Sequence, residues 1–159
     1  MTLDVPAAGT YERQLLDRLL IDLSWNSSRL EGNTYSLLET RRLLELGVSA
    51  DGRSAFEAQM ILNHRWAIEF LAAGPDAPEL NRHTVLSLHA LLSDNLLPDP
   101  AAGGRLRTTM IGIGQSVYEP LAAPPVMAEC FTTLLQKAVA ISHPAASFEA
   151  ARSPGAPTC

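Results

Sequence analysis

The chain has 159 residues, of which 47% are hydrophobic and 18% are charged, and its formal net charge is −5. This length and composition predict a single globular domain and argue against a disordered chain. With one lysine and no basic stretch, the chain lacks the positive face that nucleic-acid binding needs. No apolar run is long enough to span a membrane, and the first ten residues do not resemble a secretory signal, so we expect a cytoplasmic protein without a membrane partner.

The first predicted helix covers Tyr11–Ser28, where apolar residues recur at steps of three and four. Its apolar face consists of Leu15, Leu16, Leu19, Leu20 and Leu23. Gly32-Asn33 ends this helix. Glu31 lies at the negative pole of the helix dipole, where a carboxylate is mildly unfavourable, so the residue fits a binding partner better than it fits helix stability. The alternative is an ordinary helix end with a solvated glutamate.

Four more helices are predicted, each bounded by capping or helix-breaking residues. They run from Thr34 or Ser36 to Gly47, over Ser54–Ala73, from Asn81 to about Leu92, and from Pro124-Pro125 to Ser142-His143-Pro144. The apolar stripe expected on the Ser54–Ala73 helix comprises Phe56, Met60, Ile61, Ala67, Ile68 and Leu71. Cys130 is expected to be a buried thiol. His83 and His89 are six residues apart and do not form a helical metal pair.

Between the last two helices the pattern changes to one that is typical of strands. Leu106–Ile113 alternates apolar and polar residues, Gly114-Gln115-Ser116 provides a turn, and Val117-Tyr118 returns. This predicts a short β-hairpin. Residues 1–10 are expected to be flexible. The tail Ala145–Cys159 has little apolar surface and is expected to be disordered.

Three segments together resemble the Fic (filamentation-induced-by-cAMP) domain family. Ser27-Ser28-Arg29-Leu30-Glu31-Gly32 resembles its inhibitory-helix motif, S/T-x-x-x-E-G/N. The segment 88–92 resembles the helix before its substrate-positioning flap, and 104–120 resembles the flap. The resemblance implies a mainly α fold: a Fic-like helical bundle with one short β-hairpin, incomplete at the C-terminus. It divides the chain into an inhibitory helical region (11–47) and a partial Fic domain (48–144) whose flap lies at about 105–119.

The resemblance also implies roles for particular residues. The inhibitory motif consists of Ser27, Glu31 and Gly32. The flap that positions the target consists of Arg107, Thr108, Thr109, Met110, Ile111 and Tyr118. Fic enzymes transfer AMP from ATP to a hydroxyl of a target protein, so the resemblance implies ATP, Mg²⁺ and an unknown target protein. In the family, the inhibitory glutamate pairs with an arginine of the catalytic motif and keeps ATP out of its productive pose.

The catalytic motif of the family, H-x-F-x-D/E-G-N-G-R-x-x-R, has no match in these 159 residues. His143-Pro144 is followed by Ala145-Ala146-Ser147, where the motif requires phenylalanine and an acidic residue. We therefore assign no catalytic residue and no metal ligand, and expect an inactive, truncated or frame-shifted Fic protein that self-associates through uncovered apolar surface. The alternatives are a non-enzymatic helical module, whose Glu31 helix acts on another Fic core, and a damaged product without function.

Overall fold

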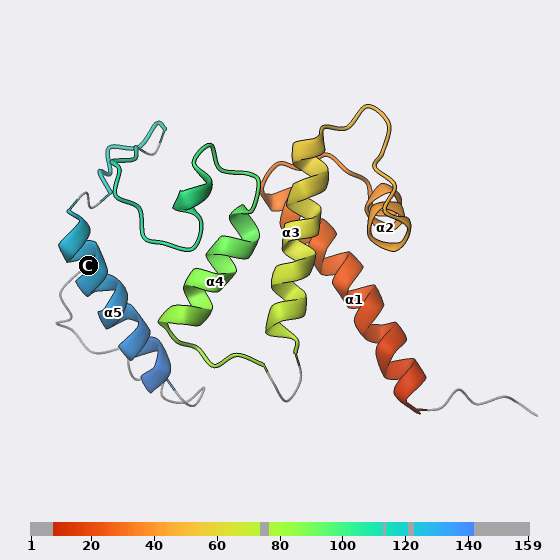
Figure 1. Cartoon of the computed structure of the whole chain (residues 1–159), viewed down its shortest axis with the longest axis horizontal. Helices are drawn as coiled ribbons and strands as arrows, with labels where there is room; N and C mark the ends of the chain where they lie inside the picture. The colour runs from red at the N-terminus through yellow and green to blue at the C-terminus, as the bar shows by residue number, and fades with distance from the viewer. Residues whose placement is uncertain (1–7, 74–76, 113, 121–122, 142–159) are drawn as a thin grey trace, which may run out of the picture.

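The computed structural model describes residues 8–73, 77–112, 114–120 and 123–141. This part of the chain is mainly helical (Figure 1). Its elements are α1 (Ala8–Leu30), α2 (Leu37–Leu46), α3 (Ala55–Leu71), α4 (Arg82–Ser93), the single 3₁₀ turn η2 (Pro100–Ala102) and α5 (Pro124–Ala140). The predicted helices are thus present, although α1 starts three residues earlier than predicted and continues to Leu30.

The predicted caps account for where the helices begin. Ser36 and Ser54 each form a capping box, in which the serine hydroxyl accepts the N–H of the third helical residue and that residue's glutamate accepts the N–H of the serine. Asn81 caps α4 by accepting the N–H of Thr84 at 3.0 Å. Gly47 ends α2 in the left-handed conformation, with φ of 69°, as is usual for a glycine after a helix.

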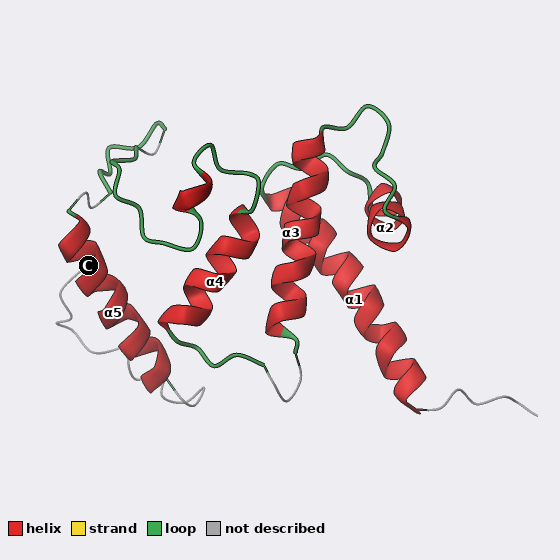
Figure 2. Cartoon of the chain, viewed as in Figure 1, coloured by secondary structure: helices red, strands yellow, loops and turns green. Residues whose placement is uncertain are grey.

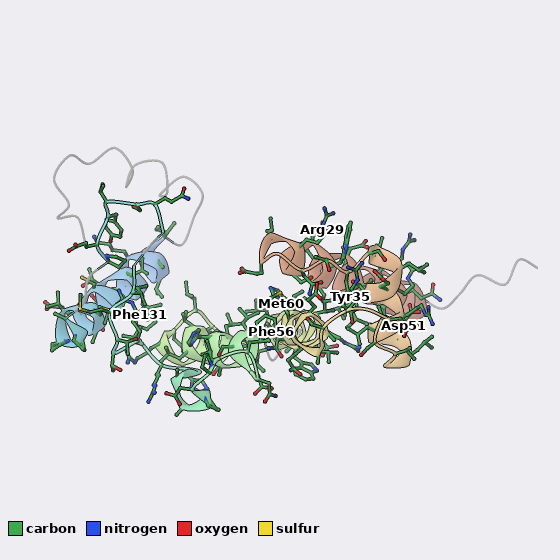
Figure 3. All side chains as sticks on the ribbon, turned by 90° about the horizontal axis from the view of Figure 1, so that it is seen from above. Arg29, Tyr35, Asp51, Phe56, Met60 and Phe131 are labelled. Atoms are coloured by element: carbon green, nitrogen blue, oxygen red, sulfur yellow. The ribbon has the colours of Figure 1, made fainter. Side chains whose placement is uncertain are left out.

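The arrangement is centred on α3. In Figures 1 and 3 the helices follow one another along the long axis, from α2 and α1 through α3 and α4 to α5. Helices α1 and α4 pack on α3, and α2 packs mainly on α1. Helix α5 lies beyond α4, where Arg82 of α4 is placed over the ring of Phe131 at 5.4 Å from its centroid. The helix at the centre therefore positions both of its neighbours.

The apolar core lies where α2, α3 and the segment before α2 meet. Tyr35, Leu43, Ala58 and Ile61 form it, and Ile61 is fully buried. Burying one such aliphatic side chain stabilises a fold by about 1.5–3 kcal/mol relative to leaving it exposed. Buried polar side chains supplement this small core; two of them, Asn33 and Asn63, link neighbouring elements to α3.

Two predicted apolar faces are less buried than expected. Of the five leucines predicted to form the apolar face of α1 only Leu20 is buried, whereas Leu15, Leu16, Leu19 and Leu23 are each between 43% and 48% exposed. In α3, Met60, Ile61 and Ala67 are buried as predicted, but Phe56 and Leu71 are about half exposed. Cys130 is half-buried. The reason is which side of α1 packs on the rest of the chain. Leu20, Ile21, Ser24 and Ser28 are buried, whereas Leu15, Leu19 and Leu23, spaced four residues apart, lie on a neighbouring side that the described chain covers only in part.

The hairpin predicted in the flap is not confirmed. Residues 105–112 and 114–120 are loop, and no strand occurs in the described ranges (Figure 2). A two-stranded hairpin is marginal in water unless a third strand or a helix packs on it, and this loop is largely exposed. The predicted disordered tail and His143 lie outside the described residues.

Candidate functional site

The last turn of α1 brings the predicted inhibitory residues together. The carbonyl oxygen of Ser28 accepts the N–H of Glu31 at 3.1 Å and that of Asn33 at 3.0 Å, which closes the helix end. Gly32 has φ of 90°, a conformation that side chains disfavour, so a glycine suits this turn. Ser27 is half-buried, whereas the Glu31 side chain is exposed and has no hydrogen bond or ion pair within the described chain. The carboxylate is thus available to a partner.

Asn33 fixes this helix end to α3. Its side chain is 6% exposed, and its Nδ2 donates to the carbonyl oxygen of Glu57 at 2.7 Å. Its Oδ1 accepts the N–H of Tyr35 at 2.9 Å, and the Sδ of Met60 lies 3.8 Å from Nδ2. A buried amide with both ends bonded holds its neighbours in one geometry, because leaving either end unpaired is costly. Asn33 lies two residues after Glu31 and therefore fixes the backbone turn from which the Glu31 side chain extends.

A second bond joins α1 to the same turn. Trp25 Nε1 donates to the carbonyl oxygen of Tyr35 at 2.9 Å, across ten residues of sequence. The guanidinium of Arg29 lies over the Trp25 ring, 4.9 Å from its centroid, in a cation–π contact. Figure 3 shows Tyr35 and Met60 in the region between α1 and α3. The last two turns of α1 are therefore held by an aromatic residue as well as by Asn33.

The turn after α1 is bonded to Glu57 of α3. Its carboxylate accepts the hydroxyl and the N–H of Thr34 and the N–H of Ser54. These bonds, led by that of the Thr34 hydroxyl, lower the pKa of Glu57 to about 2. Arg53 donates to the same Thr34 hydroxyl at 2.6 Å and to Glu39 at 3.4 Å, and bonds from Ser36 are the main reason that the pKa of Glu39 is also lowered.

The predicted flap residues are gathered in one exposed loop after η2. Arg107 Nη1 donates to the carbonyl oxygen of Thr109 at 3.2 Å. Thr108 and Thr109 are exposed, and so are Met110 (81%), Ile111 and Tyr118. The apolar side chains of this loop do not pack in the core of the described chain. Exposed apolar patches of this kind mark interaction sites.

Helix α4, which precedes this loop, is tied to α3 by a second buried asparagine. Asn63 is fully buried, and its Nδ2 donates to the carbonyl oxygens of Leu92 at 3.1 Å and Asp94 at 2.8 Å. Gln59 donates to Asn63 Oδ1 at 2.8 Å. The end of α4 would otherwise leave carbonyl groups unpaired, so Asn63 caps α4 from the neighbouring helix.

A cavity of about 580 Å³ lies at the base of the flap. Its lining is mainly apolar and comes from α4, from the segment 97–109 and from Phe131 of α5. The charged and titratable side chains around it are His89, Asp99, Arg105 and Arg107. Helix α4 separates this region from the end of α1 along the long axis, so the structure keeps the two predicted site segments apart (Figure 1).

The described residues contain no ready-made cluster of metal ligands. Across residues 8–141, apart from the gaps, no group of three or more His, Cys, Asp or Glu side chains is placed to hold a metal ion.

None of the described helices is long and apolar enough to cross a membrane.

Sequence reasoning missed the two asparagines. The sequence predicts Gly32-Asn33 only as a helix end and assigns no role to Asn63. Asn63 could have been found, because a polar residue next to Met60 and Ile61, on the buried side of α3, must have partners. Nothing in the sequence reveals that Asn33 reaches α3, because that contact spans 24 residues.

Comparison with known proteins agrees with this architecture. The chain is 30% identical over 106 residues to protein adenylyltransferase fic-1 of Caenorhabditis elegans, a match that covers 65% of this chain and 20% of that protein. It is 32% identical over 94 residues to protein adenylyltransferase Fic of Drosophila grimshawi, covering 58% and 19%. No family model matches the chain.

The fold is also that of a solved Fic protein. A fragment of Fic-1 from C. elegans superposes with a TM-score of 0.63, covering 88% of this chain and 42% of that one at 24% identity. The helical bundle described here is therefore a Fic fold. In sequence as well as in fold, the chain is thus similar to Fic adenylyltransferases. The chain spans about a fifth of the length of the curated relatives that it matches.

Proposed function

We propose that this chain is the regulatory and target-positioning part of a Fic adenylyltransferase. Residues 11–47 form the inhibitory region, with Glu31 as the inhibitory carboxylate, and residues 48–144 form part of the Fic domain, with the flap at about 105–119. The relatives that carry the name protein adenylyltransferase support this class of activity. The substrate of the whole protein would be ATP together with a hydroxyl group of an unknown target protein.

The observation that supports the role of Glu31 is its exposure on a rigidly anchored helix end. A glutamate that pairs with an arginine of another segment must be accessible. Its backbone should also be fixed beforehand, because conformational entropy lost on pairing weakens the ion pair. Glu31 is exposed, and the turn around it is held by Trp25, Ser28 and Asn33. Its place at the end of α1 brings no helix-dipole stabilisation that would otherwise explain it.

The loop conformation of the flap supports a target-induced hairpin. An extended peptide that adds to an exposed edge supplies backbone hydrogen bonds along the segment with which it pairs. The loop at 107–118 has exposed apolar side chains and threonines, which favour strands. We propose that this segment becomes strand when a target segment pairs with it.

We propose further that the 159-residue chain transfers no AMP by itself. The sequence has no match to the histidine, acidic and glycine-asparagine residues of the family motif, and the described residues provide no cluster for Mg²⁺. Incubation with α-labelled ATP and a protein lysate should give no labelled protein, whereas a relative that has the motif should give labelled bands. Labelling that needs this chain would contradict this part of the proposal.

A second candidate is action in trans on another Fic core. The accessible carboxylate of Glu31 favours it, because nothing in the described chain occupies that group. The chain would then be a regulator that inhibits a separate enzyme. Titration of the chain into a relative's Fic domain that lacks its own inhibitory helix separates the two candidates. Inhibition that depends on Glu31 supports the trans regulator, and a failure of the two proteins to bind leaves the regulatory role within one polypeptide.

A further inference from the structure

The start of the flap is bonded to α4 through a histidine. The backbone N–H of Gly104 donates to His89 Nδ1 at 3.0 Å. A nitrogen that accepts a hydrogen bond carries no proton, so the His89 ring is neutral in this state and has its proton on Nε2. A histidine ring with both nitrogens protonated could not make this bond.

The loop lies close against α4 at this point. Gly104 has φ of 71°, and a Cβ atom built there would lie 3.1 Å from the Ala90 Cβ and 3.3 Å from the Leu86 carbonyl oxygen. At Gly103 a Cβ atom would lie 3.2 Å from Ser93 Oγ. Both glycines therefore let the loop backbone lie closer to α4 than a residue with a side chain would allow. The bond from Gly104 to His89 holds the loop at this distance.

Further polar contacts lie within the loop itself. Asp99 accepts the N–H of Ala101 at 2.9 Å, which caps η2, and Arg105 Nη2 at 3.0 Å. The side chains of Asp99 and Arg105 are more than half exposed, so this ion pair adds little stability. It shapes the loop without joining it to α4. Arg107, the first predicted flap residue, follows Gly104 by three positions.

We propose that His89 is a positioning residue for the flap. Its neutral ring accepts the Gly104 N–H and so fixes the backbone just before residues 107–118. Protonation of Nδ1 removes this acceptor, so the Gly104 backbone is then no longer bonded to α4. This inference rests on the proposed role of the loop as the flap. It adds a pH-dependent element, because histidine is the side chain whose charge changes between about pH 5 and 8.

The charged groups around His89 are compatible with this. Asp99 and Arg105 line the same cavity and neutralise one another, Arg107 bonds the Thr109 carbonyl, and α5 contributes the uncharged Phe131. The described groups around the cavity thus place no unbalanced carboxylate beside the ring that would take the place of Gly104 as its partner.

The test is amide hydrogen exchange at Gly104, measured by NMR on the full chain from pH 7.5 to 5. In the unsubstituted chain, exchange relative to the intrinsic rate should rise roughly fivefold toward pH 5, as expected for the loss of one hydrogen bond. The variant His89→Asn places an uncharged oxygen near the Nδ1 position and should keep Gly104 protected at both pH values. The variant His89→Ala should show the faster exchange at both. His83→Asn, an exposed histidine of the same helix, is the matched control and should behave as the unsubstituted chain.

The chemical shifts of residues 107–111 form the second readout. They should change with pH in parallel with Gly104 in the unsubstituted chain, and should be independent of pH in His89→Asn. If the exchange rate of the Gly104 amide changes neither with pH nor with the substitutions, the bond between Gly104 and His89 is not formed in solution and the proposal is wrong. A response at Gly104 without one at 107–111 would overturn the positioning role. Neither readout uses AMP transfer, so a wrong assignment of the flap's function would leave both results unchanged and would be detected separately.

Discussion

Asn33 is bonded to the backbone of Glu57, and the residue that follows Asn33 is bonded to the Glu57 side chain. The Asn33 side chain donates to the Glu57 carbonyl oxygen at 2.7 Å, and the Glu57 carboxylate accepts the N–H of the next residue, Thr34, at 2.9 Å. Two consecutive residues after α1 thus hold the first turn of α3. Since Glu31 lies just before them, the position of its carboxylate depends on this junction.

Replacing Asn33 by Ala should destabilise the fold by about 2 kcal/mol, because the half-buried Glu57 carbonyl and the buried Tyr35 N–H would both lose a partner. Urea unfolding followed by circular dichroism measures the change. Asn26→Ala is the matched control: Asn26 lies on α1 and its side chain also donates to a backbone carbonyl, at 2.8 Å, but it is exposed. It should cost less than about 0.5 kcal/mol. Equal losses in the two variants would show that the junction is not important for stability.

The low pKa of Glu57 predicts a stability change in acid. Its folded-state pKa of about 2 lies below the ordinary value of 4.5, so the carboxylate stabilises the fold above pH 4.5 and this contribution disappears as the pH falls toward 2. The free energy of unfolding should therefore decline from pH 5 to 2, and decline less steeply in Glu57→Gln. Glu45→Gln, which alters an exposed carboxylate of α2, should leave the slope unchanged. A Glu57→Gln variant with the full decline would contradict the assignment.

The exposed leucines of α1 predict self-association. Leu15, Leu16, Leu19 and Leu23 lie on one helix and are each nearly half exposed, a contiguous apolar surface of the kind that proteins usually cover. Sedimentation velocity should show a mass that rises with concentration. The double substitution Leu19→Glu and Leu23→Glu should reduce this rise, whereas Leu38→Glu, at a 68% exposed leucine of α2, should not. A concentration-independent monomer would refute the prediction.

Mg-ATP should leave thermal unfolding unchanged. A nucleotide bound at a hundred times its dissociation constant adds about 2.7 kcal/mol to stability and raises the unfolding temperature. Since the chain has no match to the catalytic motif, we expect no shift in circular dichroism melts, in contrast to a relative that has the motif. A cooperative transition raised by Mg-ATP would reveal a nucleotide site that this account omits.

The helices could be predicted from the sequence because their signals are local. Ser36, Ser54 and Asn81 act within three residues of themselves, and Gly47 ends α2 through its own backbone conformation. The degree of burial could not be predicted in the same way. Periodicity predicts that the α1 leucines share a face, but Leu20 is buried while Leu19 and Leu23 are nearly half exposed, because burial depends on which side of α1 packs on α3.

The candidate site was predicted only in part for the same reason. The order of Ser27, Glu31 and Gly32 is a local pattern, and the structure places them at one helix end. The anchor Asn33 and the link between His89 and Gly104 join residues 24 and 15 positions apart, which no local pattern encodes. The flap was predicted as a hairpin from strand propensity, but propensity alone does not form a two-stranded hairpin that nothing packs against.

The most direct test of the account is a titration of this chain into a relative's Fic domain from which the inhibitory helix has been removed. The measured quantity is the incorporation of labelled AMP into protein. If the end of α1 presents Glu31 as an inhibitory carboxylate, incorporation should fall as the chain is added, and Glu31→Gly should abolish the effect while Glu45→Gly retains it. Equal inhibition by the unsubstituted chain and by Glu31→Gly, or no inhibition at a concentration where the two proteins are shown to bind, would contradict that role of Glu31.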